Sequence, residues 1–210
     1  MFATPHMTET EPRTFQMRRS CQNLVQPRSL ATIMALMLVN ACTSYITPVV
    51  TLPPLGRQPL EQSALVLLSE ELENYEIVHA DGGARYYFAM GHSVTDALET
   101  MFGSVYAEVE VRRNVGQAAQ MLAIANIDDL SVAYLAIPRL QATVVKGGFD
   151  TLIELQIAVD FIDTASGQST IVTAESRDSG IIDLSGTTET VIREAVMSLQ
   201  RRVFGTFGSR

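Results

Sequence analysis

The sequence predicts an α+β protein, a two-layer sandwich in which a mostly antiparallel sheet carries helices packed on one face. Three observations lead to this prediction. Residues 140–177 alternate apolar and polar side chains and are interrupted by two turn signals, as in a β meander. Residues 93–105 and 188–204 instead repeat apolar side chains at helical spacing. Shorter strand patterns lie on both sides of the first of these helices.

The first helix has the clearest pattern. Ser93 and Asp96 have the spacing of a capping box, which predicts that the helix starts at Ser93. Its apolar residues share one face: Val94, Ala97, Leu98, Met101, Phe102 and Val105. Residues 107–112 then alternate valine with charged side chains, which predicts a strand whose Glu108 and Glu110 face water.

Upstream, residues 75–80 and 85–90 are expected to form a hairpin across the turn signal Asp81-Gly82-Gly83. Residues 63–73 are expected to form a short helix that leads into the domain. Downstream, residues 115–127 are expected to form a helix ended by Asp128-Asp129, and residues 131–137 a strand.

The closing helix, residues 188–204, has a continuous apolar stripe along one face. The stripe consists of Val191, Ile192, Ala195, Val196, Leu199 and Val203. Arg201 and Arg202 near its end suit the negative carboxyl end of a helix dipole. Together these patterns predict strands, a helix, a strand, a short helix, a meander and a final helix.

The amino-terminal part has a different character. The apolar run Leu30–Val39 is about ten residues long, which fits a secretory h-region of about 7–15 residues rather than a membrane span of roughly 20. Arg18, Arg19 and Arg28 precede it. The run ends in Val39-Asn40-Ala41-Cys42, which resembles the lipobox of bacterial lipoproteins, although Asn40 is more polar than that motif usually has.

This resemblance implies that a signal peptidase cuts between Ala41 and Cys42 and that Cys42 carries a diacylglycerol on its sulfur. Further fatty acyl chains, such as palmitate, are added to the new amino terminus. We expect residues 1–41 to be the signal peptide, starting at Met17. Two alternatives stay open: a buried core helix that ends in Cys42, and a plain signal peptide or uncleaved anchor.

Residues 42–61 are expected to be the lipidated cysteine and a proline-rich tether, followed by a single periplasmic α+β domain over residues 62–210. Proline favours extended backbone, so about 20 residues would reach up to ~60 Å. The alternative is a partner-docking segment, in which Val49, Val50, Leu52 and Leu55 add as a strand to another protein.

The lipobox resemblance places the protein on the periplasmic face of the outer membrane. Thr43 follows the cysteine at a position where an aspartate tends to retain enteric lipoproteins in the inner membrane, so the absence of aspartate favours the outer membrane. The inner membrane is the alternative, because the rule is weak outside enteric bacteria. Of the 23 acidic and 15 basic side chains, two acidic and four basic ones precede Cys42, which leaves the rest of the chain with a net charge of about −10. Such a surface repels phosphate backbones, so no nucleic-acid partner is expected.

Catalytic, metal and cofactor sites are not expected. His79 sits in a strand pattern and His92 just before a helix, and two histidines with no free cysteine make a poor zinc site. Asp128-Asp129 lacks the ligand spacing of a calcium loop. Glu108 and Glu110 are better explained by a solvated strand face than by a carboxylate pair. The aromatic run Tyr86-Tyr87-Phe88 is expected to pack at the core and its rim.

The order of these features resembles the small proteobacterial lipoproteins of the YajG and LptE-like kind. The resemblance rests on the lipobox, on Gly91-His92-Ser93 before an amphipathic helix, on a strand ending in Ile137-Pro138, and on a turn Asp163 to Gly167. It implies a tethered α+β sandwich that acts as a binding or assembly subunit, and it transfers no functional residue apart from Cys42.

We therefore expect a membrane-anchored, non-enzymatic adaptor or assembly subunit of a cell-envelope complex. Its partners would be the membrane, through the lipid on Cys42, and envelope proteins. A periplasmic small-ligand or lipid-binding lipoprotein is the alternative. An envelope hydrolase is disfavoured, since no nucleophile and base can be assembled from these residues.

Overall fold

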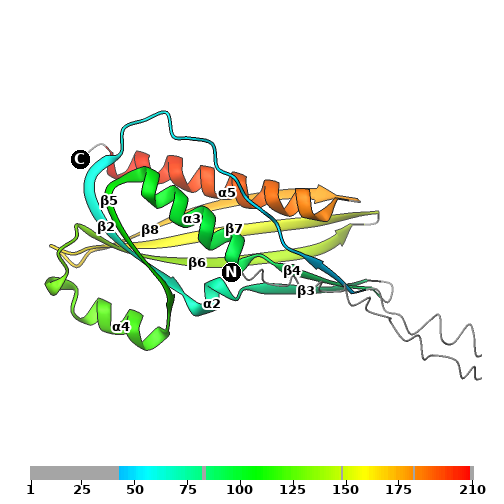
Figure 1. Cartoon of the computed structure of the whole chain (residues 1–210), viewed down its shortest axis with the longest axis horizontal. Coiled ribbons are helices and arrows are strands. Elements are labelled where there is room, and N and C mark those ends of the chain that lie inside the picture. The colour runs from blue at the N-terminus through cyan, green and yellow to red at the C-terminus, as the bar shows by residue number, and fades with distance from the viewer. Residues whose placement is uncertain (1–42, 82–83, 148, 182, 209–210) are drawn as a thin grey trace, which may run out of the picture. The chain divides into compact units, whose positions relative to one another are not determined.

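The computed structural model describes residues 43–81, 84–147, 149–181 and 183–208 (Figure 1). Cys42 and the expected signal peptide, residues 1–41, lie outside the described residues. The elements follow in this order: β1 (Thr43–Ile46), β2 (Leu60–Ser69), α2 (Glu70–Glu73), β3 (Glu76–Asp81), β4 (Ala84–Ala89), α3 (Gly91–Val105), β5 (Tyr106–Val115), α4 (Gln117–Ala125), a 3-10 turn (Ile127–Asp129), β6 (Tyr134–Gly147), β7 (Asp150–Asp163), β8 (Ser169–Gly180) and α5 (Leu184–Phe207).

The main sheet has five strands in the order β5-β2-β6-β7-β8. The β6-β7-β8 part is the predicted antiparallel meander, with Ala142 opposite Leu155 and Leu155 opposite Ser176. The turn between β7 and β8 uses Gly167 at a positive φ of 67°, a conformation that glycine adopts without steric cost. The alternation of apolar and polar residues thus sets the register as expected.

The prediction of a helix over residues 63–73 was wrong. Residues 60–69 form β2, which lies between β5 and β6 and pairs with both in parallel. Residues 64–68 are all buried, because one face of β2 meets the main core and the other meets a second cluster. A strand covered on both faces has no alternating pattern and is easily mistaken for a helix. The helical part is the single turn α2, where Ser69 Oγ accepts from Leu72 N–H at 3.0 Å.

A second sheet has the order β1-β4-β3. The predicted hairpin is confirmed, because β3 and β4 pair antiparallel with Ile77 opposite Phe88. Strand β1 adds to it in parallel, with Thr43 opposite Arg85 and Ile46 opposite Phe88. A strand at residues 43–46 was not predicted, since its partner lies about 40 residues away in the chain.

The α+β sandwich is confirmed. Helices α3 and α5 cover one face of the main sheet, and their predicted stripes are buried in the main core. Helix α3 begins at Gly91, and the expected capping box is absent because Ser93 Oγ donates to Pro48 O. Helix α4 packs against the other face, beside a smaller cluster that includes Leu65, Leu135 and Ile162. The helices therefore do not all lie on one face, and the strands form two sheets rather than one (Figure 1).

Candidate interaction surfaces and lipidation site

The chain enters the described structure one residue after Cys42, the predicted lipidation site. Thr43 is already paired with Arg85 as the first residue of β1. Of the segment that follows, Ile46 and Pro48 are buried, and Val50, Leu52 and Leu55 pack against the main core. The expected free tether over residues 42–61 is therefore wrong for residues 43–61, because their apolar side chains cover the domain's own core. The same packing leaves little of this segment for the alternative role of a docking strand.

The aromatic run in β4 is core and rim packing, as predicted. Phe88 is buried and Tyr86 packs against the main core. Tyr87 points to the outer side of the small sheet, where its ring stacks on Tyr45 with a centroid distance of 4.8 Å. Tyr45 is 70% exposed, so the outer face of this sheet presents an aromatic surface two residues beyond Thr43.

Glu73 is the most deeply buried acidic side chain of the described residues, with 5% exposure. Arg113 on β5 reaches it with Nε 3.1 Å from Oε1, and also donates from Nη2 to Asp96 Oδ1 at 2.5 Å. The hydrogen bond from Arg113 to Asp96 raises the pKa of this guanidinium, as do the charges of Asp96, Glu73 and Glu99. These ion pairs connect α2, α3 and β5. We call Glu73, Asp96, Glu99 and Arg113 together the electrostatic clamp.

Gly91 allows α2 and α3 to meet at this clamp. A Cβ at Gly91 would lie 2.2 Å from the carbonyl oxygen of Glu73, a clash with backbone that no rotamer can relieve. His92, the next residue, lies in the first turn of α3, with Nδ1 3.8 Å from Glu73 Oε1. His79 lies on β3, half-buried, so the two histidines belong to separate elements. Within the described ranges no three histidine, cysteine, aspartate or glutamate side chains are grouped to hold a metal ion.

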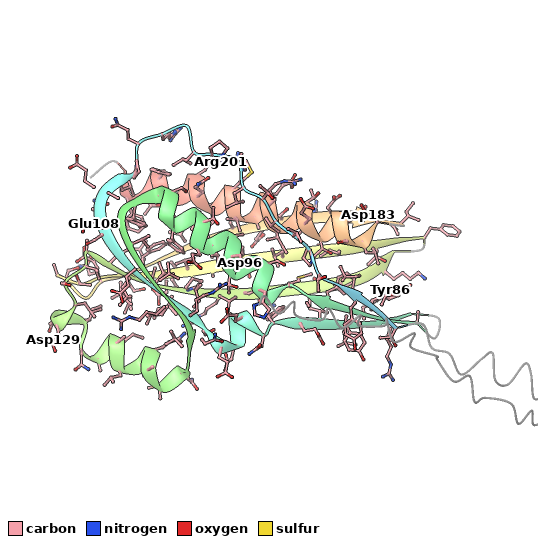
Figure 2. All side chains as sticks on the ribbon, viewed as in Figure 1. Tyr86, Asp96, Glu108, Asp129, Asp183 and Arg201 are labelled. Carbon is pink, nitrogen blue, oxygen red and sulfur yellow. The ribbon has the colours of Figure 1, made fainter. Side chains whose placement is uncertain are left out.

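The remaining acidic candidates are solvated, as expected. Glu108 and Glu110 are exposed on β5, and Glu110 pairs with Arg112 at 2.7 Å. Asp128 and Asp129 are exposed in the 3-10 turn that follows α4. Figure 2 shows that Glu108, Asp129 and Asp96 lie on different elements and do not converge on one site. These positions give no chemical site.

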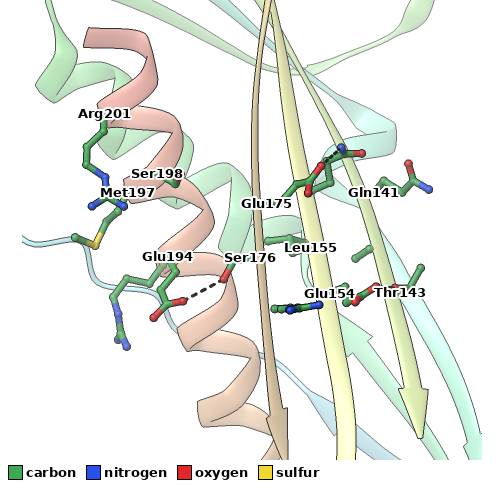
Figure 3. A pocket seen from close by; sticks show the side chains of 14 residues that line it. Gln141, Thr143, Glu154, Leu155, Glu175, Ser176, Glu194, Met197, Ser198 and Arg201 are labelled. Carbon is green, nitrogen blue, oxygen red and sulfur yellow. Dashed lines mark hydrogen bonds between the residues drawn. The ribbon is translucent and has the colours of Figure 1, made fainter. Parts of the chain in front are cut away.

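A groove of about 860 Å³ lies along the meander and α5 (Figure 3). Charged and polar side chains dominate its walls: Gln156 Nε2 donates to Glu175 Oε1 at 2.6 Å, and Ser176 Oγ donates to Glu194 Oε2 at 3.2 Å. Acidic and basic side chains alternate there, with Arg177, Arg193 and Arg201 among the basic ones. Ala142, Leu155 and Met197 also line the groove, so its walls are of mixed polarity.

Helix α4 is the most unusual surface of the protein. Its sequence, QAAQMLAIA, has no charged residue, and none of its residues is buried. Met121 is 64% and Leu122 63% exposed, and Ile124 is exposed as well. A hollow of about 670 Å³ runs beside it against α2 and β6, where the side-chain nitrogen of Gln120 is buried and has no partner among the described residues. The sequence predicts this helix but not its exposure, although the absence of a charged face was a signal.

None of the helices in the described part of the chain is long and apolar enough to cross a membrane. The segment Leu30–Val39 lies outside the described residues.

Comparisons with known proteins give similarity of fold only. No family model matches the chain, and no curated protein matches it. Solved structures do match. The hypothetical protein CT253 from Chlamydia trachomatis is 9% identical with a TM-score of 0.46, over 72% of this chain and 100% of that one. The PelC dodecamer from Paraburkholderia phytofirmans is 18% identical with a TM-score of 0.36, over 71% and 95%. The lipoprotein GNA1162 from Neisseria meningitidis is 12% identical with a TM-score of 0.37, over 71% and 99%. The resemblance to YajG and LptE-like proteins stays a prediction.

Proposed function

We propose that the protein is a bacterial lipoprotein, anchored through Cys42 to the periplasmic face of the outer membrane, that acts without catalysis as an adaptor or assembly subunit of a cell-envelope complex. The anchor is supported by the sequence of Leu30–Cys42 and its basic flank. Two or three acyl chains hold a protein stably on a bilayer, whereas one chain holds it only marginally.

The observation that carries the adaptor role is the exposure of α4. A helix with apolar side chains all round is normally buried, and an apolar patch on a soluble surface marks an interaction site. Met121 and Ile124, at positions i and i+3, are neighbours on one side of this helix, and Leu122 extends this exposed apolar patch around it. Helix α4 lies at the end of the domain opposite Thr43, and is therefore directed away from the proposed anchor (Figure 1).

The chemistry around α4 defines the partner. Asp128 and Asp129 follow the helix. Glu70 and Glu71 line the hollow beside it together with one basic residue, Arg139, so acidic side chains are in the majority there. A partner that fits presents an apolar groove for the helix with lysine or arginine side chains at its rim. The net charge of about −10 on residues 42–210 favours the approach of such a basic partner.

The alternative, binding of a small ligand or lipid between sheet and helices, has less support. That space is occupied by the protein's own side chains, which form one continuous cluster from Phe88 through Leu98 and Phe161 to Phe207. The groove on the meander is open and has charged side chains as well as apolar ones on its walls.

Mass spectrometry tests the anchor. The wild-type protein and the Cys42→Ala variant are expressed in a Gram-negative host and extracted from the membrane fraction. We expect the wild type to begin at Cys42 and to carry acyl mass, and the variant to lack both features. A wild-type protein with an intact amino terminus, or cleaved elsewhere without lipid, would refute the proposal.

The size of the solubilised complex tests the adaptor role. Leu122→Glu places a charge in the apolar patch, and Ile171→Glu on β8 is the matched control, because Ile171 is also exposed but lies on another element. We expect wild type and Ile171→Glu to migrate in a complex larger than one chain, and Leu122→Glu to migrate as a single chain. If Leu122→Glu stays in the complex, α4 is not the docking surface.

A further inference from the structure

One end of the domain gathers several connections. Strand β1 starts there with Thr43 opposite Arg85, next to the β3–β4 hairpin. The β6–β7 hairpin and the passage from β8 to α5 reach the same end, with Gly147 opposite Asp150 and Thr151 opposite Gly180 (Figure 1). Tyr86 and Asp183 are near this end in Figure 2, whereas Asp129 marks the opposite one.

This end exposes apolar side chains that the fold does not need. Phe149, at the tip of the β6–β7 hairpin, is 94% exposed. Five of the ten large hydrophobic side chains exposed in the described residues lie on this hairpin, on the adjoining start of the β8–α5 connection, or on the outer face of the small sheet: Tyr45, Val78, Val145, Phe149 and Ile181. Three others are on α4. The exposed apolar surface is thus concentrated in two places, and only one of them is next to the chain's entry.

We infer that this end of the domain rests on the bilayer and that Phe149 is inserted at the level of the lipid headgroups. The inference rests on the proposed acylation of Cys42. Because Thr43 is paired with Arg85, a single peptide unit separates the lipidated residue from the folded sheet. One residue spans roughly 3.3 Å, so the anchor has no spacer and holds this end against the membrane surface.

The contact is apolar rather than electrostatic. Tyrosine rings favour the membrane–water interface, and phenylalanine can be buried at the boundary between headgroups and acyl chains, so Tyr45 and Phe149 would reach this region together. Arg85 and Lys146 are exposed at this end, but Asp150 lies directly beside the same hairpin, so both signs of charge are present. Binding of this kind is weakly dependent on salt and does not require anionic lipids. A lipid surface of zwitterionic headgroups therefore fits this end.

Tryptophan fluorescence gives a direct test, because the chain contains no tryptophan. The acylated full-length Phe149→Trp protein is reconstituted into vesicles of phosphatidylcholine and phosphatidylethanolamine, with and without bromine on the acyl chains. Leu122→Trp on α4 is the matched control, since Leu122 is also exposed but lies at the other end. Both substitutions are at exposed positions and leave the core unchanged.

We expect the emission of Phe149→Trp to shift to shorter wavelength in vesicles and to be quenched by brominated lipid, at low and high salt alike. The emission of Leu122→Trp stays at its aqueous wavelength and is not quenched. Acylated Phe149→Trp that is neither shifted nor quenched overturns the inference and leaves the lipoprotein proposal intact, and a protein docking site at this tip then takes its place. Equal quenching of both variants also overturns it, because the domain then lies flat. Absence of acyl mass from the same sample refutes the proposed function and this inference with it.

Discussion

Helices α3 and α4 cover opposite faces of the same sheet and have opposite relations to water. Helix α3 buries its whole apolar stripe, while α4, whose sequence is the more apolar of the two, buries none of its residues. The difference lies in the other face of each helix. Helix α3 exposes Asp96 and Glu99 to solvent, whereas α4 has no charged residue. A helix that packs on a core normally keeps a charged face in water, and α4 has only the amides of Gln117 and Gln120 as polar side chains.

The packing partners show the same contrast. Helix α3 packs beside α5 on the same face of the sheet, where Phe102 meets Phe161 at a centroid distance of 6.1 Å. Helix α4 has Ala123 as its contribution to the second cluster, with Leu65 and Leu67 of β2 on the other side. The face of the sheet under α3 and α5 is therefore covered by the chain's own helices, and we call it the closed face. The opposite face is covered only where α4 packs against it.

The largest expected effect comes from truncating one leucine on each helix. Leu98→Ala leaves a cavity in the closed face and should lower the free energy of unfolding by about 2–5 kcal/mol. Leu122→Ala removes an exposed side chain and should change it by no more than about 0.5 kcal/mol. Urea unfolding of both variants measures the difference. Similar losses in the two would mean that α4 belongs to the core, and would remove the basis of the adaptor proposal.

A smaller effect is expected at the clamp that holds the start of α3. Arg113→Ala leaves the carboxylate of Glu73 buried without its cation, which should cost about 1–3 kcal/mol. The value is kept below that of a fully buried pair because the side chain of Arg113 is 35% exposed and its charge is partly screened. Arg112→Ala is the control, since its pair with Glu110 is exposed and should contribute between about 0 and 1 kcal/mol.

Thermal unfolding at low and high salt distinguishes the contributions of these two arginines to stability. Equal melting temperatures for Arg113→Ala and Arg112→Ala would show that the clamp contributes nothing specific to the closed face. The raised pKa of Arg113 keeps it charged wherever these measurements are made, so pH does not confuse the comparison.

The same contrast explains what the sequence could predict. The stripes of α3 and α5 and the alternation of β7 were found because each pattern contrasts a buried face with a wet one. Strand β2 was missed because both its faces are buried, and β1 because its partner is remote in the chain. Proline at 48, 53, 54 and 59 indicated a free tether, but proline fixes local backbone and says nothing about whether Val50 or Leu52 finds a core to cover.

The candidate surfaces, too, include some features that the sequence predicted and some that it did not. Solvated carboxylates such as Glu108 and Glu110 were predicted from alternation alone. The exposure of α4 and Phe149 was not predicted, because the identity of an apolar residue does not show whether it packs within the chain or against another molecule. Only the three-dimensional arrangement shows that no described residue covers them.

The smallest expected effect is a gain in stability, and it concerns a buried hydroxyl group without a hydrogen-bond partner on the face covered by α3 and α5. Tyr106 is 1% exposed, and its hydroxyl has no hydrogen-bond partner in the described part of the chain. Tyr106→Phe removes an unsatisfied group and should raise the free energy of unfolding by up to about 1 kcal/mol. Burial, with a smaller effect of Tyr134, raises the pKa of the Tyr106 phenol, so the folded state keeps it neutral.

The pH dependence of Tyr106→Phe follows from that raised pKa. The unfolded phenol ionises near pH ~10, so the wild type loses stability as the pH rises through this value, whereas the contribution is fully present below it. The advantage of Tyr106→Phe should therefore grow above pH ~10, which melting temperatures at neutral and alkaline pH can measure. A variant less stable than the wild type at neutral pH would show that the hydroxyl is satisfied by water, and that the closed face is wetter than its side-chain packing indicates.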